Sequence, residues 1–252
     1  MKRIDDKITA LLAYKDRDTN LAFCLASIHG CKPRPSVILV DFGSEVSAKP
    51  YEKKYPWLKV IRVERNTKFF HKGRAYNIAI KVVKTKFVVA TDVDQIFHPG
   101  FFKEVMKALV WNPKPFVMCR THFWRKPLPE YLTPENVAAS YLRLKGEIPK
   151  GDKIGGEGCC MGFSTAWIRS VNGWDEGYIG QGPEDSDIML RAVISGHKRI
   201  WITGNTHMIH LPHGRDQEYL KKYMKKNREK YFQRKKVTKQ VVVNQGKKWG
   251  QM

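Results

Sequence analysis

Asp92 and Asp94 stand two residues apart, directly after a short apolar run at residues 87–91. A run of this length that is rich in β-branched residues predicts a buried strand. Both carboxylates are then expected at the carboxyl edge of a sheet, where open α/β sheets bind their ligands. Such oxygen donors hold divalent metals together with substrate phosphates. The alternative is that both aspartates are turn and helix-cap residues before residue 100.

A second acidic group consists of Glu184, Asp185 and Asp187, directly after Pro183. Proline suits the first position of a helix. In that helix Asp185 shares one face with apolar residues, namely Ile188, Met189 and Ala192. The carboxylate therefore turns toward the body of the protein, where it can take a proton from a substrate hydroxyl. The alternative is an acidic helix start that only complements the helix dipole.

The elements that must position these residues alternate along the first half of the chain. Strands are expected at residues 8–14, 37–40, 58–63 and 87–91, the second ending on Asp41. Helices are expected at residues 18–30, with Asp18 as a plausible N-cap, and at 73–84, with Ala75, Ile78, Ala79 and Val82 inward. This alternation predicts an α/β protein with βαβ units and a mostly parallel sheet.

The second half continues with elements of both kinds. Helices are expected after Gly100, over residues 133–145 and 164–171, and from Pro183 onward. Strands are expected at residues 116–121, 159–163 and 199–203. We place Arg191 in an ion pair that supports the helix beginning at Pro183.

The charge of the chain is strongly positive. Its 252 residues contain 46 Lys and Arg against 24 Asp and Glu, a formal net charge of +22. Residues 215–252 contain 13 basic and 3 acidic residues, so this tail carries +10 and the rest +12. Such a field favours phosphate-bearing or otherwise anionic partners. We expect a domain at residues 1–214 followed by a basic, helical extension at 215–252.

The cysteines and the hydropathy pattern bear on the compartment. Five cysteines without a regular spacing argue against a disulfide scaffold and fit a reducing environment. No stretch approaches the roughly 20 apolar residues that span a bilayer. We therefore expect a cytoplasmic protein, with attachment to the inner membrane face as an option for the tail.

Five motifs occur in a fixed order. They are the turn at residues 14–17, residues 37–41 with Gly43-Ser44, residues 73–77, Asp92-x-Asp94, and residues 173–176 with Gly182-x-Glu184-Asp185-x-Asp187. Together they resemble the GT-A-type inverting glycosyltransferases, which use nucleotide sugars. The last motif is also similar to the carboxyl-terminal signature of galactosyl- and N-acetylgalactosaminyl-transferases. The resemblance spans about residues 5–213 and implies a GT-A, Rossmann-like fold.

The resemblance implies roles for the donor side of a site. Asp94 corresponds to the residue that binds a divalent metal, Mn²⁺ or Mg²⁺, and Asp92 to one that contacts ribose or the metal through water. His210 or His213 corresponds to a further metal ligand, with His210 preferred because it lies closer to the last strand. The resemblance implies UDP as the nucleotide, with contacts from Tyr14, Arg17, Asp41, Arg74 and Asn77.

The acceptor side follows from the same resemblance. Asp185 corresponds to the catalytic base and Glu184 to a residue that holds the acceptor. Trp174, beside the acidic loop, is expected to stack on an acceptor sugar, with packing at a turn as the alternative. We expect the anion of Asp185 to be stabilised by the helix N-terminus, and a single base with no covalent intermediate implies inversion at the sugar carbon.

The acceptor and the competing functions stay open. The expected acceptor is a glycan or a lipid-linked glycan, with the basic tail on an anionic membrane surface. The alternative acceptor is a hydroxylated base in DNA, with the tail on nucleic-acid phosphates. A non-catalytic nucleotide-sugar-binding protein and a nucleotidyltransferase are further alternatives. The retained Asp92, Asp94 and Asp185 argue against the first, and Asp185 argues against the second, which would have no use for it.

Overall fold

The computed structural model describes residues 7–64, 70–150, 152, 154–156, 158–180, 182–202, 207–214, 217–236 and 239–252. Seven strands form the main sheet in the order β3-β2-β1-β4-β8-β6-β9. Their bounds are Leu58–Arg62 (β3), Ser36–Asp41 (β2), Ile8–Tyr14 (β1), Phe87–Asp92 (β4), Cys160–Ser164 (β8), Pro115–Cys119 (β6) and Lys198–Ile202 (β9). Only β8 runs against its neighbours within this sheet. The predicted mostly parallel α/β fold is confirmed.

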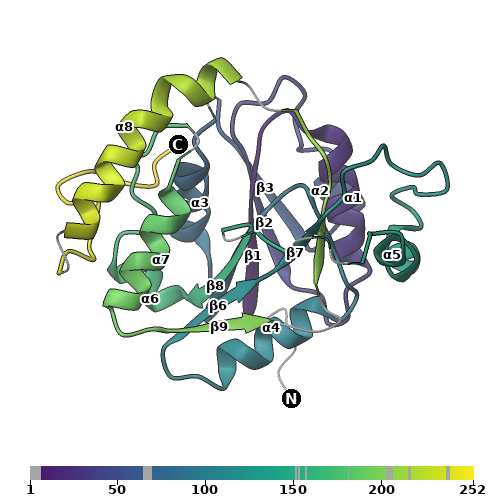
Figure 1. Cartoon of the computed structure of the whole chain (residues 1–252), viewed down its shortest axis with the longest axis horizontal. Helices are drawn as coiled ribbons and strands as arrows, with labels where there is room; N and C mark the ends of the chain where they lie inside the picture. Colours follow the sequence, from purple (N-terminus) through teal and green to yellow (C-terminus); the bar gives the residue numbers. More distant parts are fainter. Residues whose placement is uncertain are drawn as a thin grey trace.

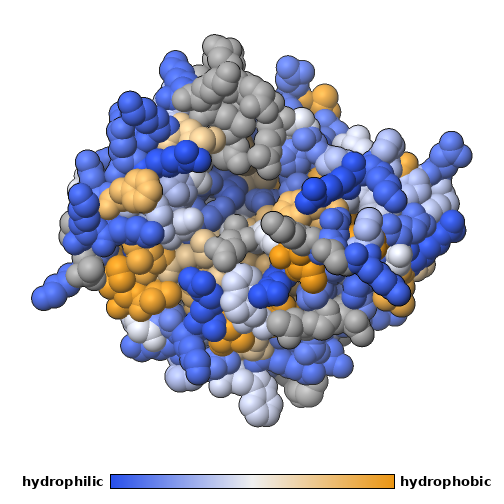
Figure 2. Space-filling model, viewed as in Figure 1, coloured by the Kyte–Doolittle hydropathy of each residue, from blue (hydrophilic) through white to orange (hydrophobic). Residues whose placement is uncertain are grey.

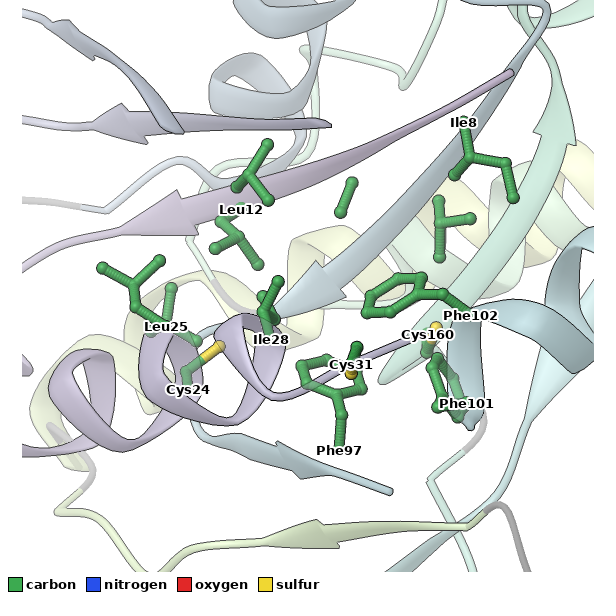
Figure 3. Close-up of a cluster of buried hydrophobic side chains, with 14 of the residues drawn as sticks. Ile8, Leu12, Cys24, Leu25, Ile28, Cys31, Phe97, Phe101, Phe102 and Cys160 are labelled. Carbon is green, nitrogen blue, oxygen red and sulfur yellow. The ribbon is translucent and has the colours of Figure 1, made fainter. Parts of the chain in front are cut away.

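Helices cover both faces of the sheet (Figure 1). Side chains alternate along β1, so Ile8 and Leu12 point to one face while Leu11 and Ala13 point to the other. The first face packs against α1 (Asp18–His29) and α4 (Phe101–Val110), where apolar residues and buried cysteines form one core (Figure 3). The second face packs against α3 (Lys72–Val82), α6 (Thr165–Ser170) and α7 (Glu184–Ile194).

A second, three-stranded sheet was not predicted. Its order is β5-β10-β7, with bounds Gln95–Phe97, Met208–His210 and Thr121–Phe123. The predicted strand at residues 116–121 is therefore two strands in different sheets, β6 and β7. Strand β10 pairs antiparallel with β5, which places His210 opposite Gln95. This small sheet brings the chain after residue 207 back to the end of β4.

The helices differ from prediction mainly at their ends. Asp18 does not cap α1: the N-cap is Arg17, and the Asp18 carboxylate accepts a hydrogen bond from the Tyr14 hydroxyl at 2.7 Å. Helix α3 begins at Lys72, and Val82, expected inward, is 39% exposed. Two further helices are α2 (Tyr51–Lys54), which was not predicted, and α5 (Val137–Gly146), which begins later than expected. The predicted strand end at Thr203 lies outside the described residues.

Part of the basic tail forms helix α8 (Gln217–Lys236), which lies alongside α7 (Figure 1). Two of its cations point inward: Lys230 Nζ lies 2.8 Å from Asp175, and Arg234 contacts both Asp175 and Asp187 at 2.8 and 2.9 Å. The side chain of Arg234 is only 9% exposed. These ion pairs anchor α8 to the segment that precedes α7 and to α7 itself.

The chain after α8 crosses the turn at residues 172–176. Asn244 donates to the carbonyl oxygens of Asn172 and Trp174 and accepts from the Glu176 amide, while the Gly250 amide donates to the Glu176 carboxylate. The predicted division after residue 214 stays a prediction, since residues 215–216 are outside the described part. The described helices include none long and apolar enough to cross a membrane.

Candidate active site

Strands β1, β2 and β3 follow one another toward one edge of the sheet, whereas β4 lies on the other side of β1. Open α/β sheets bind ligands at such a reversal of the strand order. The chain leaves β1 through Arg17 and leaves β4 through Asp94. Arg17 Nη1 lies 2.6 Å from Asp94 Oδ2, and Asp94 is 1% exposed. Two residues expected on the donor side are thereby brought into contact.

Both candidate histidines face the Asp94 carboxylate. His210 Nε2 lies 3.4 Å from Oδ1, and His213 Nε2 lies 3.3 Å from Oδ2. One ligand atom from each of the three residues lies within 4.8 Å of the others. The small sheet explains this geometry, because β10 pairs with β5 and the Leu211 amide donates to the Asp94 carbonyl oxygen. Asp92 is not in this group.

The donor set fits a divalent transition metal. Burial, followed by the nearby Asp92, raises the pKa of Asp94, whereas His210 and Arg17 act in the opposite direction. A cation bound at this carboxylate would act in the same direction as Arg17. A carboxylate with two imidazoles suits ions such as Mn²⁺ better than Mg²⁺, which prefers oxygen ligands alone.

Glu184 and Asp185 lie in the first turn of α7, where the sequence placed them. Their side chains are 6% and 16% exposed. Within the described residues, Glu184 Oε2 and Asp185 Oδ1 are buried and make no hydrogen bond of ordinary geometry, although the Trp174 side chain is close enough to Asp185 to lower its pKa. Buried carboxylate oxygens normally have partners, so a pair without them is suited to a substrate hydroxyl.

The charge of Asp185 depends on more than the helix N-terminus that the sequence suggested. Burial raises the pKa of Asp185, and the Lys72 ammonium, 2.5 Å away, opposes that rise. Burial and then Asp185 raise the pKa of Glu184 to about 8. The two neighbouring carboxyls therefore have different proton affinities in the same turn of helix, as acid–base sites require.

Gly158 brings backbone close to Asp185. Its φ is +95°, and a Cβ added there would lie 2.7 Å from Asp185 Oδ2 and 2.8 Å from Asp185 Cβ. Both the conformation and the space require glycine. The strand that follows, β8, begins with Cys160, and the Cys159 carbonyl oxygen accepts from the Asp92 amide. Gly158 and Cys159 thus connect the two acidic groups, since Gly158 lies against Asp185 and Cys159 is bonded to Asp92.

Other expected donor contacts are engaged inside the protein. Asp41 is fully buried and accepts from the amides of Ser44 and Ala48 and from Arg62 Nη1 at 2.7 Å. Asn77 is also fully buried and is hydrogen-bonded to the Trp174 backbone and to Glu176. The Tyr14 hydroxyl donates to Asp18. These side chains shape the edge of the sheet.

Arg74 and Trp174 are placed differently from expectation. Arg74 donates to the Gln251 carbonyl oxygen from both Nε and Nη2. Trp174 is fully buried between Tyr76 and Phe163, with ring centroids 4.9 and 6.1 Å away. The structure therefore leaves no ring face for an acceptor sugar, and Trp174 packs at the turn instead. Arg191, in contrast, makes the predicted ion pair, with Asp187 at 2.7 Å.

Lys72 is the residue that the sequence analysis missed. Its Nζ contacts Asp185, Asp92 and Glu184 at 2.5, 3.6 and 3.7 Å. A signal was present, because a lysine in the first turn of a helix opposes the helix dipole. A cation at such a position calls for acidic partners elsewhere in the fold.

Replacing Glu184 with glutamine should stabilise the protein at alkaline pH. The pKa of Glu184 is raised from 4.5 to about 8, so the folded state keeps a proton that the unfolded chain loses across this range. Stability contributed by that proton is present below pH 4.5 and is lost as the pH rises through 8. At pH 9 the variant should melt at a higher temperature than wild type, by about 2–4 °C for each kcal/mol of destabilisation that the substitution relieves. Near pH 4.5 the two proteins should melt at the same temperature. Equal melting temperatures at pH 9 would contradict the assignment.

Comparison with known proteins places this geometry in a family. The family model described as glycosyl transferase family 2 matches residues 10–172, more than half of the chain. A second model, described as the N-terminal domain of galactosyltransferase, matches residues 149–214. No curated protein matches. The two models together cover every residue of the two acidic groups and both histidines.

Solved structures share the fold. A crystal structure of S. aureus TarS 1–349 has a TM-score of 0.62 and 15% identity, covering 81% of this chain and 60% of that one. The complexes of the same TarS fragment with UDP and with UDP-GlcNAc have TM-scores of 0.61 and 0.60, each at 15% identity. They cover 82% and 86% of this chain and 60% and 61% of theirs. The chain thus spans about 60% of the length of these TarS fragments.

Proposed function

The chain belongs to glycosyl transferase family 2, and from this premise we propose that it transfers a sugar from a UDP-sugar to a hydroxyl group, with inversion at the sugar carbon. One observation carries the proposal: Lys72 contacts Asp92, two residues before the Asp94 carboxylate that faces His210 and His213, and also contacts both acidic residues at the start of α7. The donor class is supported by TarS, which has the same fold and was crystallised with UDP and UDP-GlcNAc.

Asp94, His210 and His213 would hold a divalent cation, for which we propose Mn²⁺ over Mg²⁺. When bound, such a cation supplies positive charge beside the departing diphosphate. Arg17 now lies against Asp94 and would have to turn away from it, toward the phosphates. The guanidinium group then binds phosphate oxygens through two parallel hydrogen bonds, which its geometry favours.

Asp185 is the proposed general base. Its carboxylate takes the proton of the acceptor hydroxyl while the acceptor oxygen bonds to the sugar carbon and the bond from that carbon to the phosphate oxygen breaks. The products are the glycoside and the nucleoside diphosphate. Since one carboxylate acts on one face of the sugar and no enzyme–sugar bond forms, the configuration inverts. Glu184, which keeps a proton more readily, would hold the acceptor by a hydrogen bond.

The acceptor we propose is a glycan or a lipid-linked glycan. The outward side of α8 carries exposed cations and an exposed aromatic ring, namely Lys222, Lys225, Lys226, Arg228, Phe232, Lys235 and Lys236. This side of the molecule is largely hydrophilic in the space-filling view (Figure 2). Basic residues around an exposed Phe suit an anionic lipid surface. A nucleic-acid acceptor is the alternative, because the same cations would contact its phosphates.

The test is a screen of nucleotide sugars with and without Mn²⁺. A bound donor should raise the melting temperature by mass action, and UDP-sugars should be hydrolysed slowly without acceptor. Donors that stabilise the protein are then offered glycolipid acceptors in anionic vesicles and hydroxylated DNA, each at low and high salt. Transfer to the vesicle acceptor that falls with salt is the expected result. A protein that no nucleotide sugar stabilises or reacts with would overturn the proposed function.

A further inference from the structure

Lys72 joins the two halves of the proposed site. Its ammonium group lies against Asp185 and also within 3.7 Å of both Asp92 and Glu184. Asp92 belongs to the donor side, at the end of β4, whereas the other two carboxylates belong to the acceptor side, on α7. The Lys72 side chain is 16% exposed, so these contacts are largely shielded from water.

The arrangement weakens the proposed base. Asp185 Oδ2 is held at 2.5 Å by a cation, so the carboxylate accepts a proton less readily than it would without Lys72. Burial alone would lower the pKa of Lys72, but Asp185, Asp92 and Glu184 together raise it well above its ordinary value. The ammonium therefore stays charged. One cation also serves three carboxylates, so the cluster retains negative charge that a further cation would relieve.

We propose that Lys72 is a positioning residue that couples donor binding to the release of Asp185. When the donor's diphosphate enters beside Asp92, Lys72 turns to the phosphate oxygens, and Asp185 becomes free to take the acceptor proton. The lysine side chain has a flexible stem of four carbons, and its ammonium group has three equivalent N–H donors. Lys72 can therefore reorient without any movement of the backbone. The base is thus available only when a donor is present.

This inference rests on the proposed function and goes beyond it, because it makes the two halves of the site interdependent. Coupling between binding events is reciprocal. If the diphosphate must take Lys72 from Asp185, then removing the charge of Asp185 must strengthen binding of the diphosphate. If Lys72 only neutralised buried carboxylates, the charge of Asp185 would not affect the affinity for the diphosphate.

The test measures the affinity of UDP and of inorganic pyrophosphate, each with Mn²⁺, by calorimetry. Asp185→Asn should bind both about fivefold more tightly than wild type, within the range of coupling between neighbouring charged groups. Glu184→Gln is the control for changing an acid to its amide beside Lys72. With a pKa of about 8, Glu184 keeps its proton at neutral pH, so this variant removes no charge, and its carboxyl group lies 3.7 Å from Lys72 and not 2.5 Å. The affinity of Glu184→Gln for UDP and for pyrophosphate should exceed that of wild type by less than twofold.

A double-mutant cycle separates this coupling from general repulsion. In a Lys72→Met background, Asp185→Asn should change the affinity by less than twofold, whereas simple repulsion between Asp185 and phosphate would preserve or enlarge the gain. Equal gains in Asp185→Asn and Glu184→Gln, or no gain in either, would overturn the inference. These two outcomes would overturn the inference even if Lys72→Met does not fold. A wild type that binds neither probe would overturn the proposed function as well.

Discussion

Replacing Asp185 with asparagine should lower the rate of sugar transfer by about 10²–10⁴-fold, the usual contribution of a general base. The amide has the shape of the carboxylate but accepts no proton from the acceptor hydroxyl. Nucleotide affinity should be undiminished, because Asp185 lies on the acceptor side of Lys72. The measurement is single-turnover transfer with donor saturating, alongside calorimetry of UDP.

Asp187→Asn is the matched control two residues along the same helix. Asp187 is fully buried and is bound by Arg191, Arg234 and the Tyr178 hydroxyl. Removing its charge leaves the buried guanidinium group of Arg191 without its carboxylate partner, which costs about 3–5 kcal/mol. The control should lower the melting temperature strongly, whereas Asp185→Asn should not. Equal losses of stability in the two variants would show that Asp185 is a structural residue.

Replacing Asp94 with asparagine should abolish the dependence of transfer on Mn²⁺ and lower the rate by roughly 10³-fold, since a metal stabilises the leaving charge by several kcal/mol. Asp94 faces both imidazoles, and no other carboxylate in the described residues completes this group. The measurement is the transfer rate as Mn²⁺ is titrated, with bound Mn²⁺ counted by electron paramagnetic resonance.

Asp92→Asn provides the comparison for Asp94. Asp92 Oδ1 lies near Lys72 and the Tyr76 hydroxyl, and not in the group with the histidines. We therefore expect this variant to keep bound Mn²⁺ and to lose less activity. Full Mn²⁺ binding by Asp94→Asn, or equal loss of Mn²⁺ in both variants, would refute the assignment of Asp94 as the direct ligand.

Much of the main sheet was predictable because its strands are long enough to show apolar runs and end on polar residues. The expected strand at residues 8–14 matches β1 at both ends. The strand that delivers Asp92 and Asp94 was also recognised, together with the helix that carries Asp185. These predictions need only local patterns of hydrophobicity and turn-forming residues.

The small sheet was not predictable in the same way. Strands β5, β7 and β10 have three residues each, too few for alternation to be visible. Their pairing joins segments about 110 residues apart and decides which histidines reach Asp94. His210 and His213 are therefore predicted only through a family resemblance, and the preference for His210 depends only on its distance from the last expected strand. The structure places both at the carboxylate.

Buried partners from distant segments account for the remaining differences. Asp41 has the type and position of a nucleotide ligand, but Arg62, its neighbour across β2 and β3, binds it. Trp174 follows an Asn-Gly turn that suggested exposure, yet Tyr76 and Phe163 enclose it. Neither contact can be read from residues adjacent in the sequence.

The hydrogen bonds of Asn244 and Gly250 to the turn before α7 also impose an order on its assembly during synthesis. The Glu176 amide donates to a residue 68 positions later, and the Glu176 carboxylate accepts from a residue 74 positions later. Strands β1 to β4 and helix α3 are translated far earlier. The turn that leads to Asp185 gains its last supports only after residue 250 has been added.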